Sequence, residues 1–302
     1  MSAPSPTPPR LLPWAFPHQQ DRLAQLRARY LLREHVLASL DGALAHAGLS
    51  AALVKGAATC SLYPLPYARE MGDLDLLADA GSLPSLRRAL LELGWSLEGP
   101  SDRPRTEHSL ELGLRAPAPA SMLVELHAGL DKVVPRLAMT RAILGRSTLA
   151  PGRRALRLPT LDDQALLVIL HLANDELGHR AGYVDLEVLT AAGASLECVL
   201  AEAERWGATT ACFAVLSAYE RLLPGSVPAA LLRRAAPHGL RERALERLFV
   251  LDPNAPERGA RSTGYAWILR QSVLRDDGAR WLRGLLRYAG ERARERVEGR
   301  LR

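Results

Sequence analysis

Two aspartates stand one residue apart inside an apolar segment that follows a Lys-Gly pair. The segment LVKGAATCSLYPLPYAREMGDLDLL covers residues 53–77, and its last part, GDLDLLA, has the pattern of a strand. Side chains at positions i and i+2 of a strand project from the same face, so Asp73 and Asp75 share one face. The leucines between and after them favour a buried core on the other side, which leaves the two carboxylates together on a second face.

Such a pair of carboxylates needs a counter-charge. Their Cβ atoms are expected roughly 6–7 Å apart. Close to apolar neighbours, either one carboxylate takes up a proton or both bind a cation. Oxygen ligands suit Mg²⁺, which keeps its remaining positions for water and phosphate oxygens. Glu125, in the later strand pattern LVELH, is a third acid in an apolar context and completes a candidate set of metal ligands with Asp73 and Asp75.

The Lys-Gly pair upstream predicts a phosphate contact. The apolar strand AALVKG ends at Gly56, and the following segment has the pattern of a short helix. The first turn of a helix presents free backbone N–H groups to an anion. Lys55 adds a point charge, and Gly56 allows close approach of a ligand to the backbone.

The sequence predicts an α+β first half and a helical second half. Helix, strand, short helix, strand, helix, strand and strand are expected in that order up to residue 150, and Thr160 with Asp163 resembles a capping box that opens a helical region. Further helical patterns follow at 182–192, 195–206, 208–223, 228–236, 239–250 and 264–302. We expect a disordered leader at 1–16, an α+β domain at 17–150 and an all-α domain at 151–302.

Composition excludes several classes of protein. The three cysteines form no CxxC pair, which argues against a disulfide framework or a thiolate zinc site. No apolar run reaches the length of a membrane span, and the Pro-rich start lacks the apolar core of a signal peptide, so we expect a cytoplasmic protein. The net charge of +6 comes from a chain in which only Lys55 and Lys132 of 39 basic residues are lysine. The arginines alternate with glutamates along helical patterns, which favours solvated helix faces over a polyanion-binding surface.

The order of these motifs resembles a known superfamily. A strand ending in glycine before a helix, a strand with DxD and an acid on a later strand are typical of the DNA polymerase β-like nucleotidyltransferases. The segment 53–77, followed by LRRALLELGW and LVELHAGL, is similar to a bacterial nucleotidyltransferase family of that superfamily. The match covers about residues 25–130 and continues weakly into LVILHLANDELGHRAGYVDLEVL. The resemblance implies a mixed sheet with flanking helices, followed here by the all-α domain.

The resemblance also implies roles for residues. Asp73 and Asp75 would bind Mg²⁺, or Mn²⁺ in its place, with Glu125 as the third carboxylate, and Lys55 and Gly56 would handle the triphosphate of an NTP such as ATP. The chain departs from the superfamily pattern because alanine follows the glycine where serine is usual, so Lys55 would replace that serine in holding phosphate.

Other polar residues have two interpretations each. Arg69 binds phosphate or forms a structural ion pair; His127 orients an acceptor, acts as a base or hydrogen-bonds to a ligand side chain. His108 is a candidate for the same cleft. From the helical half, the candidates either line the cleft or form a buried network between the halves: His171, Asp175, Arg180 and Asp185. The terminal helix, with Trp281, fits ordinary packing better than a membrane surface.

The predicted function is therefore Mg²⁺-dependent transfer of a nucleoside monophosphate from an NTP to an acceptor hydroxyl. The acceptor can be a small molecule, a tRNA or a protein. A glycosyltransferase that uses a nucleotide sugar also explains the DxD, but it explains neither Lys55-Gly56 nor Glu125. A non-catalytic nucleotide-binding regulatory protein with the same fold is the third interpretation. The sequence leaves the base, the acceptor and the oligomeric state open.

Overall fold

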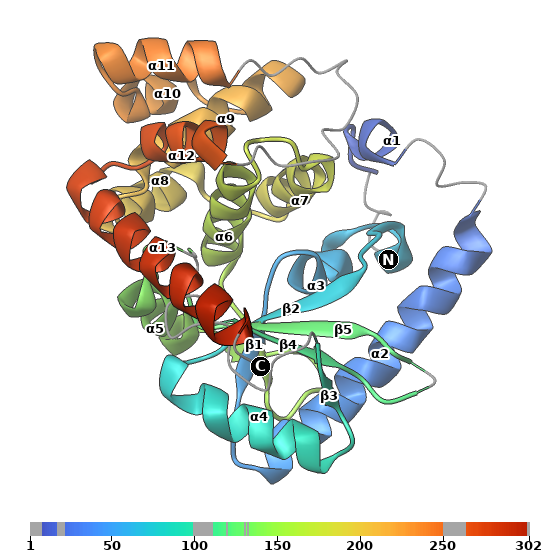
Figure 1. The fold of residues 1–302 in the computed structure, drawn as a ribbon. Coiled ribbons are helices and arrows are strands. Elements are labelled where there is room, and N and C mark those ends of the chain that lie inside the picture. The colour runs from blue at the N-terminus through green and yellow to red at the C-terminus, as the bar shows by residue number, and fades with distance from the viewer. Residues whose placement is uncertain are drawn as a thin grey trace, which may run out of the picture.

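A mixed sheet with flanking helices forms the first half of the molecule, and helices form the second half (Figure 1). The computed structural model describes residues 8–16, 22–98, 111–118, 120–129, 131, 133–249 and 264–300. The α+β architecture predicted from the sequence, with a helical region after the sheet, is confirmed.

The sheet has seven strands in the order β3-β4-β5-β2-β1-β7-β6 among the described residues. Its strands are β1 (Ala51–Leu53), β2 (Asp73–Leu77), β3 (Ser96–Leu97), β4 (Glu111–Arg115), β5 (Leu123–His127), β6 (Thr148–Leu149) and β7 (Leu156–Leu158). The β2–β5 and β1–β7 pairs are parallel, and the other pairs are antiparallel. Strand β7 belongs to this sheet although it lies beyond residue 150.

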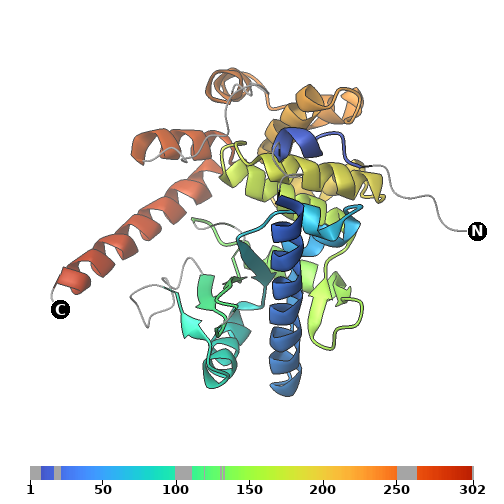
Figure 2. The ribbon, with the colours of Figure 1, turned by 90° about the vertical axis from the view of Figure 1, so that its right-hand side faces the viewer.

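The two faces of the sheet bury different surfaces. Leu74 and Leu76 are fully buried in a cluster with α2 (Leu23–His46) and α4 (Leu83–Glu92), which cover one face. The alternate residue Leu77 belongs to a second cluster, formed with the helical half. Because side chains alternate along a strand, Asp73 and Asp75 point to the same side as Leu77. The helical half therefore lies over the face that carries the carboxylates, and Figure 2 shows the two halves one above the other from a second side.

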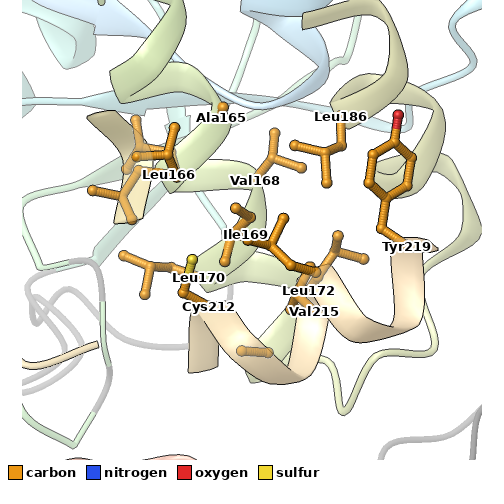
Figure 3. Packing of buried hydrophobic residues seen from close by; sticks show 14 of the residues in the cluster. Ala165, Leu166, Val168, Ile169, Leu170, Leu172, Leu186, Cys212, Val215 and Tyr219 are labelled. Carbon is orange, nitrogen blue, oxygen red and sulfur yellow. The ribbon is translucent and has the colours of Figure 1, made fainter. Parts of the chain in front are cut away.

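Helix α6 (Leu161–Asn174) is the centre of the helical half. Ten of its fourteen residues are buried, as expected for a helix surrounded by other helices. Figure 3 shows Ile169 and Leu170 packed near Cys212 and Val215 of α9 (Thr209–Leu222). Thr160 caps α6 by accepting a hydrogen bond from the Asp163 amide, as predicted. The other helices of this half are α7 (Arg180–Ala191), α8 (Leu196–Arg205), α10 (Ala229–Ala235), α11 (Leu240–Leu248), α12 (Gly264–Val273) and α13 (Gly278–Arg300).

Several elements differ from the sequence prediction. Residues 8–16, expected in a disordered leader, include helix α1 (Leu12–Ala15), and the side chain of Leu11 is buried in the helical core. The pattern at 264–302 is two helices rather than one. Its break has a physical cause: the Asp276 carboxylate accepts hydrogen bonds from the amides of Thr209 and Thr210, and Asp277 caps α13 through the Arg280 amide.

Short segments complete the sheet half. Helix α5 (Leu137–Arg146), which the sequence analysis did not predict, buries Met139 and Ile143. The antiparallel strands β6 and β7 lie between it and α6. The chain after β1 forms α3 (Gly56–Thr59) and the 3₁₀ turns η2 (Cys60–Leu62) and η3 (Pro66–Ala68), and η4 (Ala80–Ser82) follows β2.

One buried carboxylate joins the two halves. Asp185, on α7, accepts hydrogen bonds from the Thr59 hydroxyl at 2.7 Å and the Tyr63 hydroxyl at 2.8 Å. The guanidinium of Arg69 donates to both of its oxygens at 2.8 Å. Burial and the neighbouring Asp185 charge raise the pKa of the Tyr63 hydroxyl well above its ordinary value, so it stays a donor. A fully buried charge with this many partners fixes the position of α7 against the sheet half.

Replacing Asp185 with asparagine is expected to destabilise the protein strongly. The Asp185→Asn variant removes the charge that compensates the buried Arg69 guanidinium, and breaking a buried pair on one side costs about 3–5 kcal/mol. Urea unfolding followed by circular dichroism measures the change. The control is Glu197→Gln, an exposed position on α8, where a change within about 0.5 kcal/mol is expected. A loss under about 1 kcal/mol for Asp185→Asn would contradict the role of this contact.

Candidate functional site

Strand register brings the acids of three strands onto one patch of the sheet. Asp75 of β2 lies directly beside Glu125 of β5, and Leu77 lies beside His127. On the other side of β5, Glu111 of β4 lies beside His127. In-register neighbours on one face of a sheet have Cβ atoms about 4.5–5.5 Å apart. The pairing therefore places Asp75, Glu125, His127 and Glu111 within reach of one another.

Asp75 is the best-partnered of these acids. Its Oδ1 atom accepts from Lys55 Nζ at 2.7 Å and lies 2.8 Å from His127 Nε2, and only 7% of the residue is exposed. Burial opposes ionisation, but the hydrogen bond from His127 and the charge of Lys55 outweigh it. Together they hold the pKa of Asp75 well below its usual range. Asp75 is therefore a permanent negative charge on the sheet.

The other two predicted ligands have the opposite electrostatics. Burial raises the pKa of Asp73, and the neighbouring charge of Asp75 raises it further. Burial also raises the pKa of Glu125, with a further contribution from the Glu111 charge. The patch thus holds more carboxylates than its cations, Lys55 and any protonated His127, neutralise. Such a surplus of acid favours the binding of an added cation.

The donor atoms of Asp75, Glu125 and His127 all lie within 4.8 Å of one another, a spacing that fits a metal ion. His127 Nε2 is also 3.6 Å from Glu125 Oε2. Among the described residues Asp73 is not part of this group of three. Asp73 pairs with Leu123, so it lies two residues before the Asp75–Glu125 pair along the two strands. The structure therefore brings together two of the three expected carboxylates and adds a histidine.

The turn between β1 and α3 positions Lys55. Its φ of 53° lies in the left-handed region, where non-glycine residues are uncommon and sterically disfavoured. This backbone conformation accompanies a side chain that reaches Asp75. At Gly56 an added Cβ would lie 3.0 Å from the Arg69 guanidinium carbon and 3.2 Å from Met71 Cε. Glycine is thus needed here for close packing against Arg69.

A cavity of about 150 Å³ lies between the sheet and the helical half. The sheet half lines it with Lys55, Glu111, Glu125 and His127. The opposite wall comes from the end of α6 and from α12, and its polar and aromatic residues are His171, Asn174, Asp175, Trp267, Gln271 and Arg275. A cleft that carries convergent polar groups and a carboxylate with a raised pKa, here Glu125, is the default position for a binding or active site.

The remaining predicted residues are divided between the cavity and the frame around it. His171 lines the cavity, whereas Arg69 and Asp185 form the buried ion pair between the halves. Arg180 contacts α1, with its guanidinium 4.9 Å from the Trp14 ring centroid and a hydrogen bond to the Trp14 carbonyl. His108 lies outside the described residues.

Sequence reasoning missed several residues of the site. Glu111 begins a segment with alternating apolar residues, so its place on the polar face of a strand could have been read from the sequence. Trp267, Gln271 and Arg275 had no local signal, because only the packing of α12 against the end of α6 brings them to the cavity. That packing includes hydrogen bonds from the Gln271 amide to the carbonyls of Ala173 and Asn174.

The terminal helices show no membrane-spanning character. Trp281 on α13 is buried, which agrees with packing rather than a membrane surface, although Leu282 and Leu286 are exposed. Within the described residues no helix combines the length and the apolar character needed to cross a bilayer.

The sequence matches a known protein family. A family model described as an uncharacterised nucleotidyltransferase matches residues 8–224, which include the whole sheet and helices α6 to α9. No curated protein matches the sequence significantly.

The pKa shifts predict opposite pH dependences for two variants. The pKa of Glu125 is raised on folding, so ionised Glu125 costs stability at high pH, and protonation removes that cost as the pH falls. In EDTA, Glu125→Gln is expected to be more stable than the wild type at pH 8. This advantage shrinks as the pH approaches 4. The measurement is the free energy of unfolding from urea titrations at several pH values.

Asp75→Asn is the matched comparison with the opposite sign. The pKa of Asp75 is lowered on folding, so its stabilising contribution is complete above the unfolded pKa of about 3.9 and is lost as the pH falls through the folded value. The variant is expected to be less stable than the wild type from pH 8 to 5, with the deficit shrinking only below about pH 4. The same pH trend in both variants would contradict the assigned electrostatics.

Proposed function

The chain belongs to the uncharacterised nucleotidyltransferase family, and on that premise we propose that it transfers a nucleoside monophosphate from an NTP to an acceptor hydroxyl, with release of pyrophosphate. The observation that carries this proposal is the direct register of Asp75 with Glu125 on parallel strands beneath the cavity. Two carboxylates held side by side on a rigid sheet form a preorganised anionic centre.

The residues fit a divalent cation. Asp75 and Glu125 supply carboxylate oxygens, which are the ligands that Mg²⁺ prefers, and Asp73 adds a third carboxylate on the same strand face. Burial raises the pKa values of Asp73 and Glu125, and neighbouring carboxylates raise them further, so a bound cation would stabilise both ionised forms. Mg²⁺, or Mn²⁺ in its place, would neutralise phosphate oxygens and lower the pKa of an acceptor hydroxyl.

Lys55 and Gly56 are suited to the leaving pyrophosphate. Lys55 Nζ already lies at the edge of the cavity, where it pairs with Asp75. A flexible ammonium group can exchange one anionic partner for another, so this side chain can turn from the carboxylate to a phosphate oxygen. The Gly56 amide belongs to the first turn of α3, and amides there have no partner within the helix. Both groups would stabilise charge as it develops on the leaving group.

Glu125 and His127 are suited to the acceptor. Glu125 lines the cavity, where its carboxylate can accept a hydrogen bond from the acceptor hydroxyl. His127 is held in place by its 2.8 Å contact with Asp75 and can orient a hydroxyl through its ring. The helical half, with His171 and the residues of α12, would form the acceptor-binding wall.

Arg69 has a framework role in this proposal. Its guanidinium is committed to Asp185, and the same group packs against Gly56. Through this packing it would fix the backbone position of the Lys55-Gly56 turn relative to β2. The Asp185 network thus supports the site without contact with the substrate.

The proposal is tested by removing both aspartates of the strand. We expect Asp73→Asn combined with Asp75→Asn to reduce Mg²⁺-dependent pyrophosphate release by at least about 100-fold, since single preorganised charges contribute about that much to related reactions. Pyrophosphate is measured with each of the four NTPs, and cell extract serves as the source of acceptor. Mass spectrometry of the extract then identifies the molecule that gains a nucleotide.

The control is Glu92→Gln, which removes an exposed acid from α4 and should leave pyrophosphate release unchanged. Circular dichroism shows whether the double variant is folded. Retained activity in the folded double variant would rule out this site. Release of nucleoside diphosphate from nucleotide sugars, without pyrophosphate from NTPs, would favour a glycosyltransferase, and NTP binding without turnover would favour a regulatory protein.

A further inference from the structure

A second group of metal-ligating side chains stands across the cavity from the acidic patch. His171 lies in the last turn of α6, Asp175 is the C-cap residue of that helix, and His179 is the N-cap residue of α7. One donor atom of each residue lies within 4.8 Å of the donors of the other two. All three residues are half-buried, and the rings of His171 and His179 meet edge to face with centroids 5.1 Å apart.

The spacing of the first two donors also fits a metal site. His171 Nε2 lies 3.4 Å from Asp175 Oδ2. A charge-assisted hydrogen bond brings such atoms to about 2.7–2.9 Å, as happens for His127 and Asp75 at 2.8 Å. Ligands about 2.0–2.1 Å from a tetrahedral zinc ion are separated by roughly 3.3–3.4 Å. The observed distance is that of one edge of such a tetrahedron.

The turn that brings His179 back to His171 has an unusual backbone. Glu176 and Leu177 are consecutive non-glycine residues with φ of 55° and 65°. Such conformations carry a steric cost and persist where the surrounding structure enforces them. Here Glu176 forms a 2.6 Å ion pair with Arg270 of α12, and Leu177 is buried. The Tyr183 hydroxyl also donates to the Leu177 carbonyl. The turn is thus held in the shape that gathers the three donors.

From this geometry we propose that His171, Asp175 and His179 bind a divalent transition-metal ion, with Zn²⁺ as the representative ion. Imidazole nitrogens suit Zn²⁺, Fe²⁺, Cu²⁺ and Ni²⁺, whereas Mg²⁺ prefers oxygen ligands, so two imidazoles and one carboxylate favour a transition metal over Mg²⁺. His171 and Asp175 also line the cavity, so the fourth coordination position would open toward it. Three protein ligands with an open position are typical of zinc sites that bind a further ligand.

The site differs from the acidic patch in its donors and its position. The patch on the sheet offers Asp75, Glu125 and His127, whereas the second group comes from the α6–α7 connection. A metal ion there would join the last turn of α6 to the start of α7. It would also place a positive charge on the helical wall of the cavity, opposite the carboxylates of the sheet.

The test separates the two sites by variants and does not depend on turnover. Isothermal titration calorimetry with Zn²⁺ is carried out on the full chain and on Asp75→Asn combined with Glu125→Gln. One equivalent of Zn²⁺ is expected to remain bound in this double variant. Adding His171→Ala or His179→Ala to it should weaken that binding by more than about 100-fold, since even changes to the partners of ligands cost 10–100-fold. Co²⁺ titration, followed by visible absorption, provides a second readout.

The experiment includes a control variant and an alternative titration in case the double variant does not fold. His46→Ala removes an exposed histidine at the end of α2 and should leave Zn²⁺ binding unchanged. If the double variant fails to fold, the wild type is titrated with Zn²⁺ directly and compared with His171→Ala and His179→Ala, each of which should bind one equivalent of Zn²⁺ fewer than the wild type. The proposal is overturned if Zn²⁺ binding disappears with the acidic patch, or if neither histidine variant weakens it.

Discussion

The arrangement of the molecule depends on the buried carboxylate of Asp185. An uncompensated charge in this position would be costly, so its partners have to meet it, and they come from the segment between β1 and β2. This requirement fixes α7 over the sheet. Helix α6 precedes α7 and packs against it, so the end of α6 is held in place as well. This end forms the cavity wall that faces the sheet. The ion pair between Arg69 and Asp185, which lies outside the cavity, therefore helps to fix the distance between the sheet and the end of α6.

The acids on the sheet face differ in their neighbours: Asp75 has basic partners, whereas Asp73 and Glu125 lie near other carboxylates. Asp75 has both nearby basic side chains, Lys55 and His127, at hydrogen-bonding distance. Asp73 and Glu125 have burial and like charges instead, and their pKa values rise. The face thus combines one carboxylate that stays ionised with others that gain most from an added cation. A polar patch of this kind is expensive for folding, which is a reason to connect it with function rather than with stability.

Local patterns in the sequence were sufficient for part of this picture. The alternation in DLDLL placed the acids on one face and Leu74 and Leu76 on the other, and Thr160 with Asp163 marked the start of α6. The pairing of strands that are distant in the sequence could not be predicted from local patterns, because register depends on contacts across the sheet. Glu111 and His127 therefore emerged as neighbours only in the structure. The break before α13 was hidden for a similar reason, since Asp276 acts on the amides of a helix more than sixty residues earlier.

The family model covers the sheet wall of the cavity but only part of the helical wall. The carboxylates, Lys55 and the end of α6 all lie within residues 8–224, which the family model matches. Trp267, Gln271 and Arg275 lie beyond it, on or just after α12, and they reach the cavity through contacts with the end of α6. Arg275 also pairs with the buried Asp131 at 2.8 Å. If the sheet carries the transfer chemistry, then the α12 wall is where this chain can differ from its relatives. The Trp267 indole on this wall offers a stacking surface, whereas Gln271 and Arg275 are buried and bonded to the end of α6 and to Asp131, so these two residues fix the shape of the wall.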